Sequence, residues 1–262
     1  MFAAINTGLR KIAPGLHRQL KRTVQQSRLP LPKMVWGGIV WTYPRLWNRV
    51  VVDESVLRWI VEYLKPGDVF FDIGAHQGWL SLAAAWQTGS MGKVVAFEPS
   101  PASVELLSFH KRVNRLVQMD IVPKAVSKTD SSSIPFILEG DGDSVMNSLI
   151  EIEEVRVGPR GRTVIPVEAI TLDSYCESTG LTPTMIKIDT EGSEIWVCEG
   201  AKKLLSESRP ALIIATHPAW LPSGQKIEDL FGLLSSLGYR VAACDSLQHA
   251  RGDFRDYLFL AE

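Results

Sequence analysis

The sequence has few cysteines and no long apolar run, and both shortages exclude whole classes of protein. Its three cysteines, Cys176, Cys198 and Cys244, are far apart and form no CxxC pair. That spacing argues against a disulfide framework and against a structural zinc site. The longest apolar runs fall well short of the roughly 20 residues that span a bilayer, and no secretory signal opens the sequence. We therefore expect a cytoplasmic protein.

Acidic residues are absent from the first 52 positions, although the chain has 29 of them. Those positions hold nine of the 28 Lys and Arg residues, so residues 53–262 have a net charge of −10. Apolar residues recur there at helical spacing: Phe2, Ile5, Leu9 and Ile12. This pattern predicts a basic N-terminal arm of short amphipathic helices. Three roles are open for the arm: a solvated segment, a contact of residues 1–28 with an anionic membrane surface, or a targeting peptide. The acidic remainder argues against nucleic acid as a partner.

The segment that ends the arm is rich in aromatic residues. Residues 34–49 contain Trp36, Trp41, Tyr43 and Trp47. So much aromatic surface would cap a core or line a substrate entrance, and we expect it to cap a core. Residues 1–52 thus form an arm and lead-in, and residues 53–262 form one domain.

Helices and short apolar strands alternate through the rest of the chain. Helices are predicted at about 55–64, after Gly78, after Pro101, and at about 193–206 and 225–237. Strands are predicted at 69–73, 94–97, 121–126, 185–188, 211–215, 240–243 and 257–260. Residues 130–170 break the alternation with two strands around a polar stretch, which indicates an insertion over one end of the sheet. The pattern predicts an α/β fold, a Rossmann-like doubly wound sheet of seven strands, mostly parallel with a C-terminal antiparallel hairpin.

The most informative segment is the turn that follows the first of these strands. An apolar strand ends in Asp72 and passes through Gly74 and Gly78 into a helix. Glycines at such a turn let the backbone approach a ligand closely. A dinucleotide would require GxGxxG to seat its pyrophosphate, which this turn lacks. It suits a cationic ligand without phosphate groups.

The next strand ends in Glu98, 26 residues after Asp72. In nucleotide-binding sheets an acid at this interval binds the ribose hydroxyls. The two strand ends together therefore predict a ligand that contains adenosine.

Four segments of the sequence, FDIGAHQGW, VVAFEPSP, TLDSY and IKIDTEGSE, resemble the FkbM-type methyltransferase family. The resemblance covers about residues 68–239 and implies a class I methyltransferase fold that binds S-adenosylmethionine. It implies that the methionine part contacts Asp72, Gly74, Ala75, His76 and Gly78. It further implies that Glu98 and Pro99 lie at the ribose, and that Lys124, Ala125 and Val126 border the adenine.

Three further acids follow the strand at residues 185–188. Asp189 should emerge at the carboxyl edge of the sheet, where α/β folds bind their ligands. Glu191 and Glu194 either join it or cap the next helix. His217 follows the next strand and should reach the same edge, although relatives often have a glutamate near this point. Three other histidines lie elsewhere: His17 in the arm, His110 in a predicted helix and His249 in the final hairpin. We expect all three to be surface residues.

Methyl transfer from a sulfonium requires alignment of the acceptor and removal of its proton. His217 or Asp189 is the candidate base, with Glu191 beside them and residues 144–149 over the acceptor. A Mg²⁺ ion on Asp189 and Glu191 is the lesser alternative, because two carboxylates lack a third ligand. We therefore expect no metal.

These features predict an O-methyltransferase that acts on a hydroxyl of a small molecule, a sugar, or a glycan or glycolipid. Two rivals come from other classes. One is a non-catalytic scaffold at a membrane surface, and the other is an NAD(P)-dependent oxidoreductase, which would require the missing GxGxxG.

Overall fold

The computed structural model describes residues 30–35, 38–42, 54–140, 144, 147–150, 161–246 and 254–262. The helices predicted in residues 1–28 lie outside this part of the chain, as do Trp36, Tyr43 and Trp47. The chain divides into two compact units, residues 1–51 with 113–115, and residues 52–112 with 116–262. In the first unit, β1 (Leu31–Val35) and β2 (Gly38–Thr42) pair as an antiparallel hairpin that the sequence did not predict. Trp41 on β2 is 42% exposed, so this aromatic residue does not cap a core.

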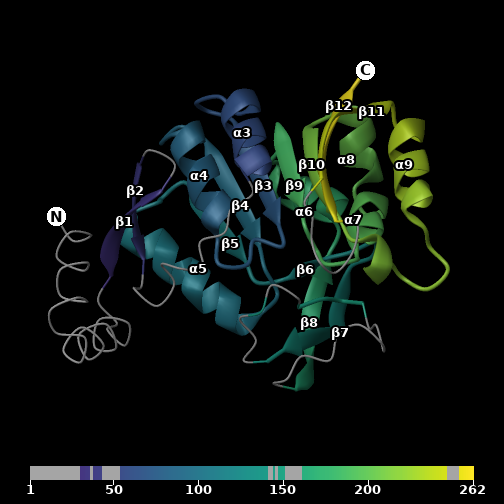
Figure 1. Ribbon diagram of the computed structural model, residues 1–262, viewed down its shortest axis with the longest axis horizontal. Helices are drawn as coiled ribbons and strands as arrows, with labels where there is room; N and C mark the ends of the chain where they lie inside the picture. Colours follow the sequence, from purple (N-terminus) through teal and green to yellow (C-terminus); the bar gives the residue numbers. More distant parts are fainter. Residues whose placement is uncertain are drawn as a thin grey trace, which may run out of the picture. The chain divides into compact units, whose positions relative to one another are not determined.

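A seven-stranded sheet organises the second unit (Figure 1). Its order is β11-β12-β10-β9-β3-β4-β5. The strands are β3 (Val69–Ile73), β4 (Lys93–Phe97), β5 (Met119–Val122), β9 (Met185–Ile188), β10 (Ala211–Thr216), β11 (Tyr239–Ser246) and β12 (Arg255–Ala261). Strands β5, β4, β3, β9 and β10 pair in parallel, whereas β12 is antiparallel to both of its neighbours. The predicted sheet is thereby confirmed.

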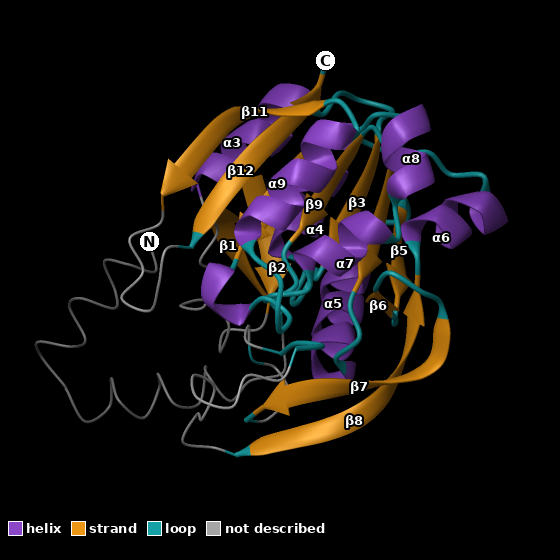
Figure 2. Ribbon diagram, turned by 90° about the vertical axis from the view of Figure 1, so that its right-hand side faces the viewer, coloured by secondary structure: helices purple, strands orange, loops and turns teal. Residues whose placement is uncertain are grey.

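Helices cover both faces of this sheet (Figure 2). One face carries α3 (Glu54–Tyr63), α4 (Trp79–Thr88) and α5 (Pro101–Val113). The other carries α6 (Leu172–Thr179), α7 (Glu194–Glu199), α8 (Lys202–Glu207) and α9 (Ile227–Ser236), whose apolar side chains share one core with the strands. The central strands β3 and β9 are apolar except for Asp72 and Lys187, because both of their faces are buried. None of the described helices has the length and apolar character needed to cross a membrane.

Two predicted elements are each divided in the structure. The strand expected at 121–126 is β5 and, after Pro123, the separate β6 (Ala125–Val126). Proline has no N–H to continue a strand ladder, which explains the break. The helix expected at 193–206 is α7 and α8, separated at Gly200, where an added Cβ would lie 2.2 Å from the carbonyl oxygen of Ser127. Helix α6, which Thr171 caps through the N–H of Ser174, was not predicted.

The segment predicted as an insertion forms a second sheet, of order β6-β8-β7. Its long strands are β7 (Ser131–Glu139) and β8 (Arg162–Ile170), and β6 begins three residues after β5 ends. Chain continuity therefore places this small sheet at the carboxyl end of the large one, as Figure 1 shows. Beyond β7, Ser148 pairs with Ile137 as an isolated bridge.

Candidate active site

Strands β3 and β9 are neighbours in the sheet. The chain continues from β3 into α4 on one face and from β9 into α7 on the other face, so the sheet has a topological switch point between these two strands. Open α/β sheets bind ligands at the carboxyl end of such a switch point. Here Asp189 follows β9, and its N–H donates to the carbonyl of Ile73 over 3.1 Å. Gly74 follows β3 with φ of +73°, and a Cβ on it would lie 1.9 Å from the carbonyl oxygen of Asp189. Only glycine fits there, so the two loops meet backbone to backbone.

A buried ion pair supports this junction from within the sheet. Lys187 Nζ lies 3.2 Å from Asp72 Oδ1 and donates to the Gly74 carbonyl over 2.9 Å. Ser81 Oγ donates to the other oxygen of Asp72 over 2.5 Å. Burial by itself would lower the pKa of Lys187, but Asp72 and Asp189 raise that pKa above its ordinary value. Asp72 is fully buried, so it positions the loop through Lys187 and Ser81 and offers no exposed oxygen to a ligand.

Glu98 fixes the same loop from the end of β4. Its carboxylate accepts the N–H of His76 over 2.8 Å and that of Ser100 over 2.9 Å. The first of these bonds holds His76 in the left-handed region, with φ of +50°. Burial raises the pKa of Glu98 to about 7, against the opposing effect of the two backbone hydrogen bonds. The carboxylate is therefore poised between its two protonation states at neutral pH.

Helix α5 packs against the end of this loop. An added Cβ on Gly78, at φ of +83°, would lie 2.1 Å from a methyl carbon of Leu107. His110 is fully buried, and its Nδ1 lies 2.7 Å from the Gln77 carbonyl oxygen. Burial lowers the pKa of His110 to about 4. The prediction of a surface histidine was wrong, because the face of α5 that carries His110 covers the loop.

The residues that the resemblance assigned to adenine lie at the start of the small sheet. Ala125 and Val126 are buried in β6. Lys124 is half-buried and pairs over 2.7 Å with Glu168 of β8. Its charge is thereby directed toward the small sheet.

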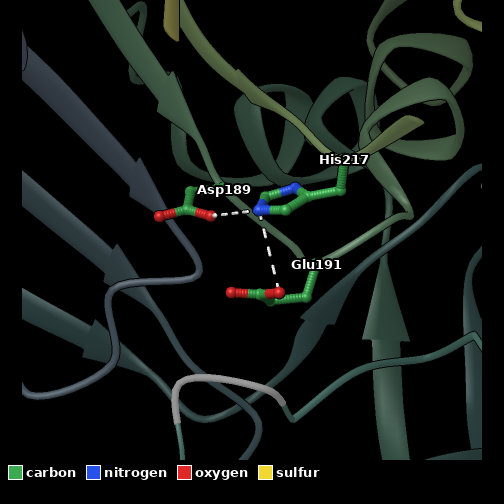
Figure 3. A group of neighbouring side chains, drawn as sticks. All are labelled: Asp189, Glu191 and His217. Carbon is green, nitrogen blue, oxygen red and sulfur yellow. Dashed lines mark ion pairs between the residues drawn. The ribbon is translucent and has the colours of Figure 1, made fainter. Parts of the chain in front are cut away.

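Asp189, Glu191 and His217 converge at the carboxyl edge (Figure 3). His217 Nε2 lies 3.8 Å from Asp189 Oδ1 and 3.7 Å from Glu191 Oε2. One ligand atom from each residue can be chosen so that all three lie within 4.8 Å of one another. Asp189 is the most exposed of the three, with 37% of its side chain accessible, whereas the His217 side chain is 9% exposed. The cluster thus opens to solvent on its Asp189 side.

The other nitrogen of His217 is held by a buried carboxylate. Glu194, in the first turn of α7, has no exposed surface, and its Oε1 lies 2.9 Å from His217 Nδ1. The same oxygen accepts the N–H groups of Thr190 and Gly192 over 3.2 and 3.0 Å. Glu194 therefore orients the histidine and the preceding loop instead of capping free N–H groups of its own helix.

Aromatic rings complete the support of His217. Trp220 stacks on the imidazole, with centroids 5.2 Å apart and an angle of 3° between the planes. Phe254 contacts both rings, at 5.1 and 4.8 Å. Trp220 belongs to the short helix η2 (Pro218–Trp220), which begins directly after His217. These contacts leave Nε2 directed at the two carboxylates.

The loop that carries Glu191 is held on both of its sides. Ser148, from the insertion, donates its hydroxyl to the Glu191 carbonyl over 2.8 Å. Gly192 has φ of +110°, and an added Cβ would lie 2.0 Å from the Trp220 carbonyl oxygen. Glu191 itself is left-handed, with φ of +55°, an uncommon conformation for a residue with a side chain. The insertion thus reaches the candidate site through Ser148, a residue of the segment 144–149 that was expected over the acceptor.

Electrostatics in the cluster follow from its excess of carboxylates. Burial by itself would lower the pKa of His217, but Glu194, Glu191 and Asp189 together raise it to about 9. Burial would likewise raise the pKa of Asp189, but Lys187 and His217 hold it below its ordinary value. In the cation-free protein at neutral pH, a proton on His217 therefore balances part of the negative charge.

The predicted residues form two groups on either side of the switch point. Those assigned to the cofactor lie on the β3 and β4 loops and in β6, and those assigned to catalysis follow β9 and β10. Sequence reasoning missed the supporting residues Ser81, Lys187, Trp220 and Phe254, whereas Ser148 belongs to the segment 144–149 that was expected near the site. Only Lys187 had a visible signal, as a charged residue inside the apolar strand MIKI.

Comparison with known proteins identifies related folds. A protein from Saccharolobus solfataricus P2, a candidate cobalt-precorrin-6B C(15)-methyltransferase (decarboxylating), is 22% identical over 167 residues, which are 62% of this chain and 81% of that protein. A candidate rRNA methylase from Clostridium thermocellum superposes with a TM-score of 0.52 at 9% identity, over 80% of this chain and 97% of its own.

The structure of methyltransferase FkbM from Methylobacillus flagellatus KT has a TM-score of 0.48 at 16% identity and aligns with 81% of this chain. The chain spans 56% of that protein's length. The seven-stranded sheet is that of class I methyltransferases. The model of the methyltransferase FkbM domain matches residues 72–241, a segment that begins at Asp72 and includes Glu98, Asp189 and His217. The chain therefore belongs to the methyltransferase FkbM domain family.

Proposed function

We propose that this methyltransferase transfers the methyl group of S-adenosylmethionine to a hydroxyl oxygen of a small molecule, a sugar, or a glycan or glycolipid. The observation that carries the proposal is the convergence of Asp189, Glu191 and His217 beside the Gly74 loop. This cluster stands where an acceptor would meet a donor bound across the switch point.

The residues around the β3 and β4 loops fit S-adenosylmethionine. Each oxygen of Glu98 accepts one backbone N–H, and a carboxylate oxygen has a second lone pair for a ribose hydroxyl. The residues that would hold the cofactor are Gly74, Ala75, His76 and Gly78 at the methionine part, Glu98 and Pro99 at the ribose, and Lys124, Ala125 and Val126 at the adenine. Asp72, which the resemblance also assigned to the methionine part, is fully buried and supports the loop from behind. When bound, the cofactor supplies an already activated methyl group.

Hydroxyl acceptors explain the cluster better than amine acceptors. An alcohol must lose its proton as the oxygen takes the methyl group, whereas a neutral amine attacks with a free lone pair. Asp189, whose pKa is held below its ordinary value, is the candidate proton acceptor in the cation-free protein at neutral pH. His217 already carries a proton there and becomes a second acceptor only when it loses that proton. A cation held by the cluster would serve the same end, by lowering the pKa of the hydroxyl. Either way, the proton of the acceptor leaves at this edge of the sheet.

Charge supports a small or glycan acceptor over a nucleic acid. Residues 53–262, which carry both groups of site residues, have a net charge of −10. A surface that follows a phosphate backbone requires clustered positive charge. A neutral hydroxyl compound meets no such requirement.

The proposal is tested with S-adenosylmethionine labelled in its methyl group and a panel of phenols, sugars, glycolipids and amines. We expect label in a hydroxyl acceptor, with tandem mass spectrometry placing the new methyl group on oxygen. Label confined to amine or carbon acceptors would contradict O-methylation. Calorimetry with S-adenosylmethionine alone shows whether the cofactor assignment stands independently of the acceptor.

Loss of His217 should affect turnover and leave cofactor binding intact. We expect His217→Ala to lower turnover by about 10²- to 10⁴-fold, the usual effect of removing a group that assists proton transfer. Its affinity for S-adenosylmethionine should equal that of the wild type, because His217 lies across the switch point from Glu98. Unchanged turnover would remove His217 from the site.

A further inference from the structure

We propose that Asp189, Glu191 and His217 form a binding site for one divalent transition-metal ion. The three residues come from two loops of the carboxyl edge and present two carboxylates and one imidazole to a shared point (Figure 3). The inference rests on the proposed function only for the role of the ion, and binding of the ion can be measured without any acceptor.

The distances fit shared ligands better than mutual hydrogen bonds. His217 Nε2 is 3.8 Å from Asp189 Oδ1 and 3.7 Å from Glu191 Oε2. Both separations exceed the range of N–H···O hydrogen bonds, about 2.7–3.2 Å. Two ligands that each lie about 2.1 Å from one metal ion are separated by roughly 3.0–4.2 Å, depending on the angle between them. Both separations from His217 fall inside that interval.

The surroundings of His217 are those of a metal-ligating histidine. Its Nδ1 lies 2.9 Å from Oε1 of Glu194, a carboxylate with no exposed surface, and its ring is stacked on Trp220. A carboxylate on the far nitrogen fixes the tautomer and orientation of a ligating imidazole. Glu194 is a positioning residue in this arrangement. The imidazole is thus directed by a partner outside the three ligands, and the site does not consist of acids alone.

The donor set selects the class of ion. Mg²⁺ prefers oxygen ligands in near-ideal octahedral geometry, whereas an imidazole nitrogen favours first-row transition metals. Two hard carboxylates with one imidazole suit Mn²⁺, which accepts both donor types. Three protein ligands leave positions open for water and for an acceptor oxygen. An ion there would lower the pKa of an approaching hydroxyl.

From the sequence, a magnesium site was only the lesser alternative and no metal was expected, because this third ligand was not considered. From the sequence, only Asp189 and Glu191 were considered as ligands, and two carboxylates were too few. His217 follows a different strand, 26 positions after Glu191. The pairing of β9 with β10 brings the histidine to the two acids.

The experiment titrates Mn²⁺ into the full-length protein, first treated with a chelator and then dialysed, and follows the six-line electron paramagnetic resonance signal of free Mn²⁺. We expect loss of that signal with a stoichiometry of one ion per chain. Asp189→Asn, Glu191→Gln and His217→Ala should each weaken binding by at least about tenfold, and Glu194→Gln by about 10- to 100-fold. Glu207→Gln, an exposed residue of α8, removes the same charge elsewhere and should bind as the wild type does.

Three results would overturn the proposal. They are a wild-type protein that leaves the free Mn²⁺ signal unchanged, ligand variants that bind like Glu207→Gln, and displacement of Mn²⁺ by an equal concentration of Mg²⁺. Circular dichroism and calorimetry with S-adenosylmethionine show that each variant is folded. Should Asp189→Asn fail to fold, Glu191→Gln decides, because Glu191 lies on the loop after β9 and outside its ladder. Mn²⁺ binding without O-methylation would defeat the proposed function alone, and O-methylation without Mn²⁺ binding would defeat the metal site alone.

Discussion

Glu98 shows how burial of one side chain sets a binding property. Its carboxylate is 5% exposed and receives two backbone N–H groups, yet desolvation still raises its pKa to about 7. Nearby, Lys187 favours the charged form and Asp72 disfavours it. The charged carboxylate accepts strong hydrogen bonds with both oxygens, whereas protonation turns one oxygen into a donor and weakens the bonds that the group accepts. The affinity for a ribose should therefore change within the physiological range of pH.

We predict that S-adenosylmethionine binds more tightly as pH rises from 6 to 8. The sign follows from the raised pKa, because Glu98 is mostly protonated at pH 6 and mostly charged at pH 8. Glu98→Gln should lose about 1.5–3 kcal/mol of binding free energy at pH 8, as expected for charge-assisted hydrogen bonds. Calorimetry at pH 6, 7 and 8 measures both effects. An equally steep pH dependence in Glu98→Gln would show that another group is responsible.

The buried ion pair between Lys187 and Asp72 should contribute to the stability of the fold. Both side chains are buried, at 6% and 0% exposure. We predict that Lys187→Met lowers the free energy of unfolding by about 3–5 kcal/mol, because it leaves Asp72 charged and unpaired in the interior. The matched control is Lys93→Met on β4, whose pairing with Asp120 is partly exposed. The control should cost less than about 1 kcal/mol. Equal losses in urea denaturation would refute the difference.

The elements that matter most for the site are the loops after β3 and β9, which touch through their backbones. Asp189 donates to the carbonyl of Ile73, and Gly74 approaches the carbonyl of Asp189. Each loop therefore restricts the position of the other. A change in the cofactor loop should consequently reach the cluster of Asp189, Glu191 and His217.

Gly74→Ala tests this contact, with Gly180→Ala as its control. The two glycines have nearly the same φ, +73° and +69°, so both variants bear a similar backbone cost. A Cβ at Gly74 lies 1.9 Å from the Asp189 carbonyl oxygen, whereas a Cβ at Gly180 meets nothing within 4 Å. We predict that Gly74→Ala loses about 1–3 kcal/mol more in stability, the usual range for overpacking. It should also weaken S-adenosylmethionine binding, and Gly180→Ala should not. Equal losses would remove the steric argument.

At the scale of the whole chain, charge is divided between its two ends. The first 52 residues have nine basic and no acidic side chains, and the rest has a net charge of −10. Both groups of site residues lie in the acidic part. The basic arm should therefore serve contact with an anionic surface and contribute nothing to cofactor binding.

Deletion of residues 1–28 tests that division. We predict that the shortened protein binds S-adenosylmethionine with unchanged affinity and sediments less with vesicles of anionic lipid. The difference should disappear at high salt, because screening weakens the attraction. Vesicles of neutral lipid provide the control. Equal binding of both proteins to anionic vesicles would contradict a membrane role for the arm.

Local sequence patterns predicted most of the sheet, because apolar strands that are buried on both faces leave a strong signal. Strands 69–73 and 185–188 were predicted at their observed bounds. At two of the places where prediction failed, a single local residue was decisive. Pro123 divides the strand predicted at 121–126 into β5 and β6, which belong to different sheets. Gly200 divides the helix predicted at 193–206, at a point where its backbone lies close to the carbonyl of Ser127. The hairpin β1–β2 and helix α6 are short and carry little periodicity, so they were missed.

The sequence by itself determined the chain order of the seven strands of the large sheet, the family, and which acids end the strands. These follow from spacing along the chain, since consecutive parallel strands must end at the same edge of a sheet. The sequence also placed His217 at the same edge as Asp189 and Glu191, but the tertiary structure alone decided the distances among the three. It alone decided that Glu194 orients His217 and that Lys187 holds Asp72 behind the loop. Those contacts join residues from neighbouring strands, and distances between them depend on sheet pairing and on loop backbones. The periodicity of a sequence predicts neither the pairing of strands in a sheet nor the backbone conformation of a loop.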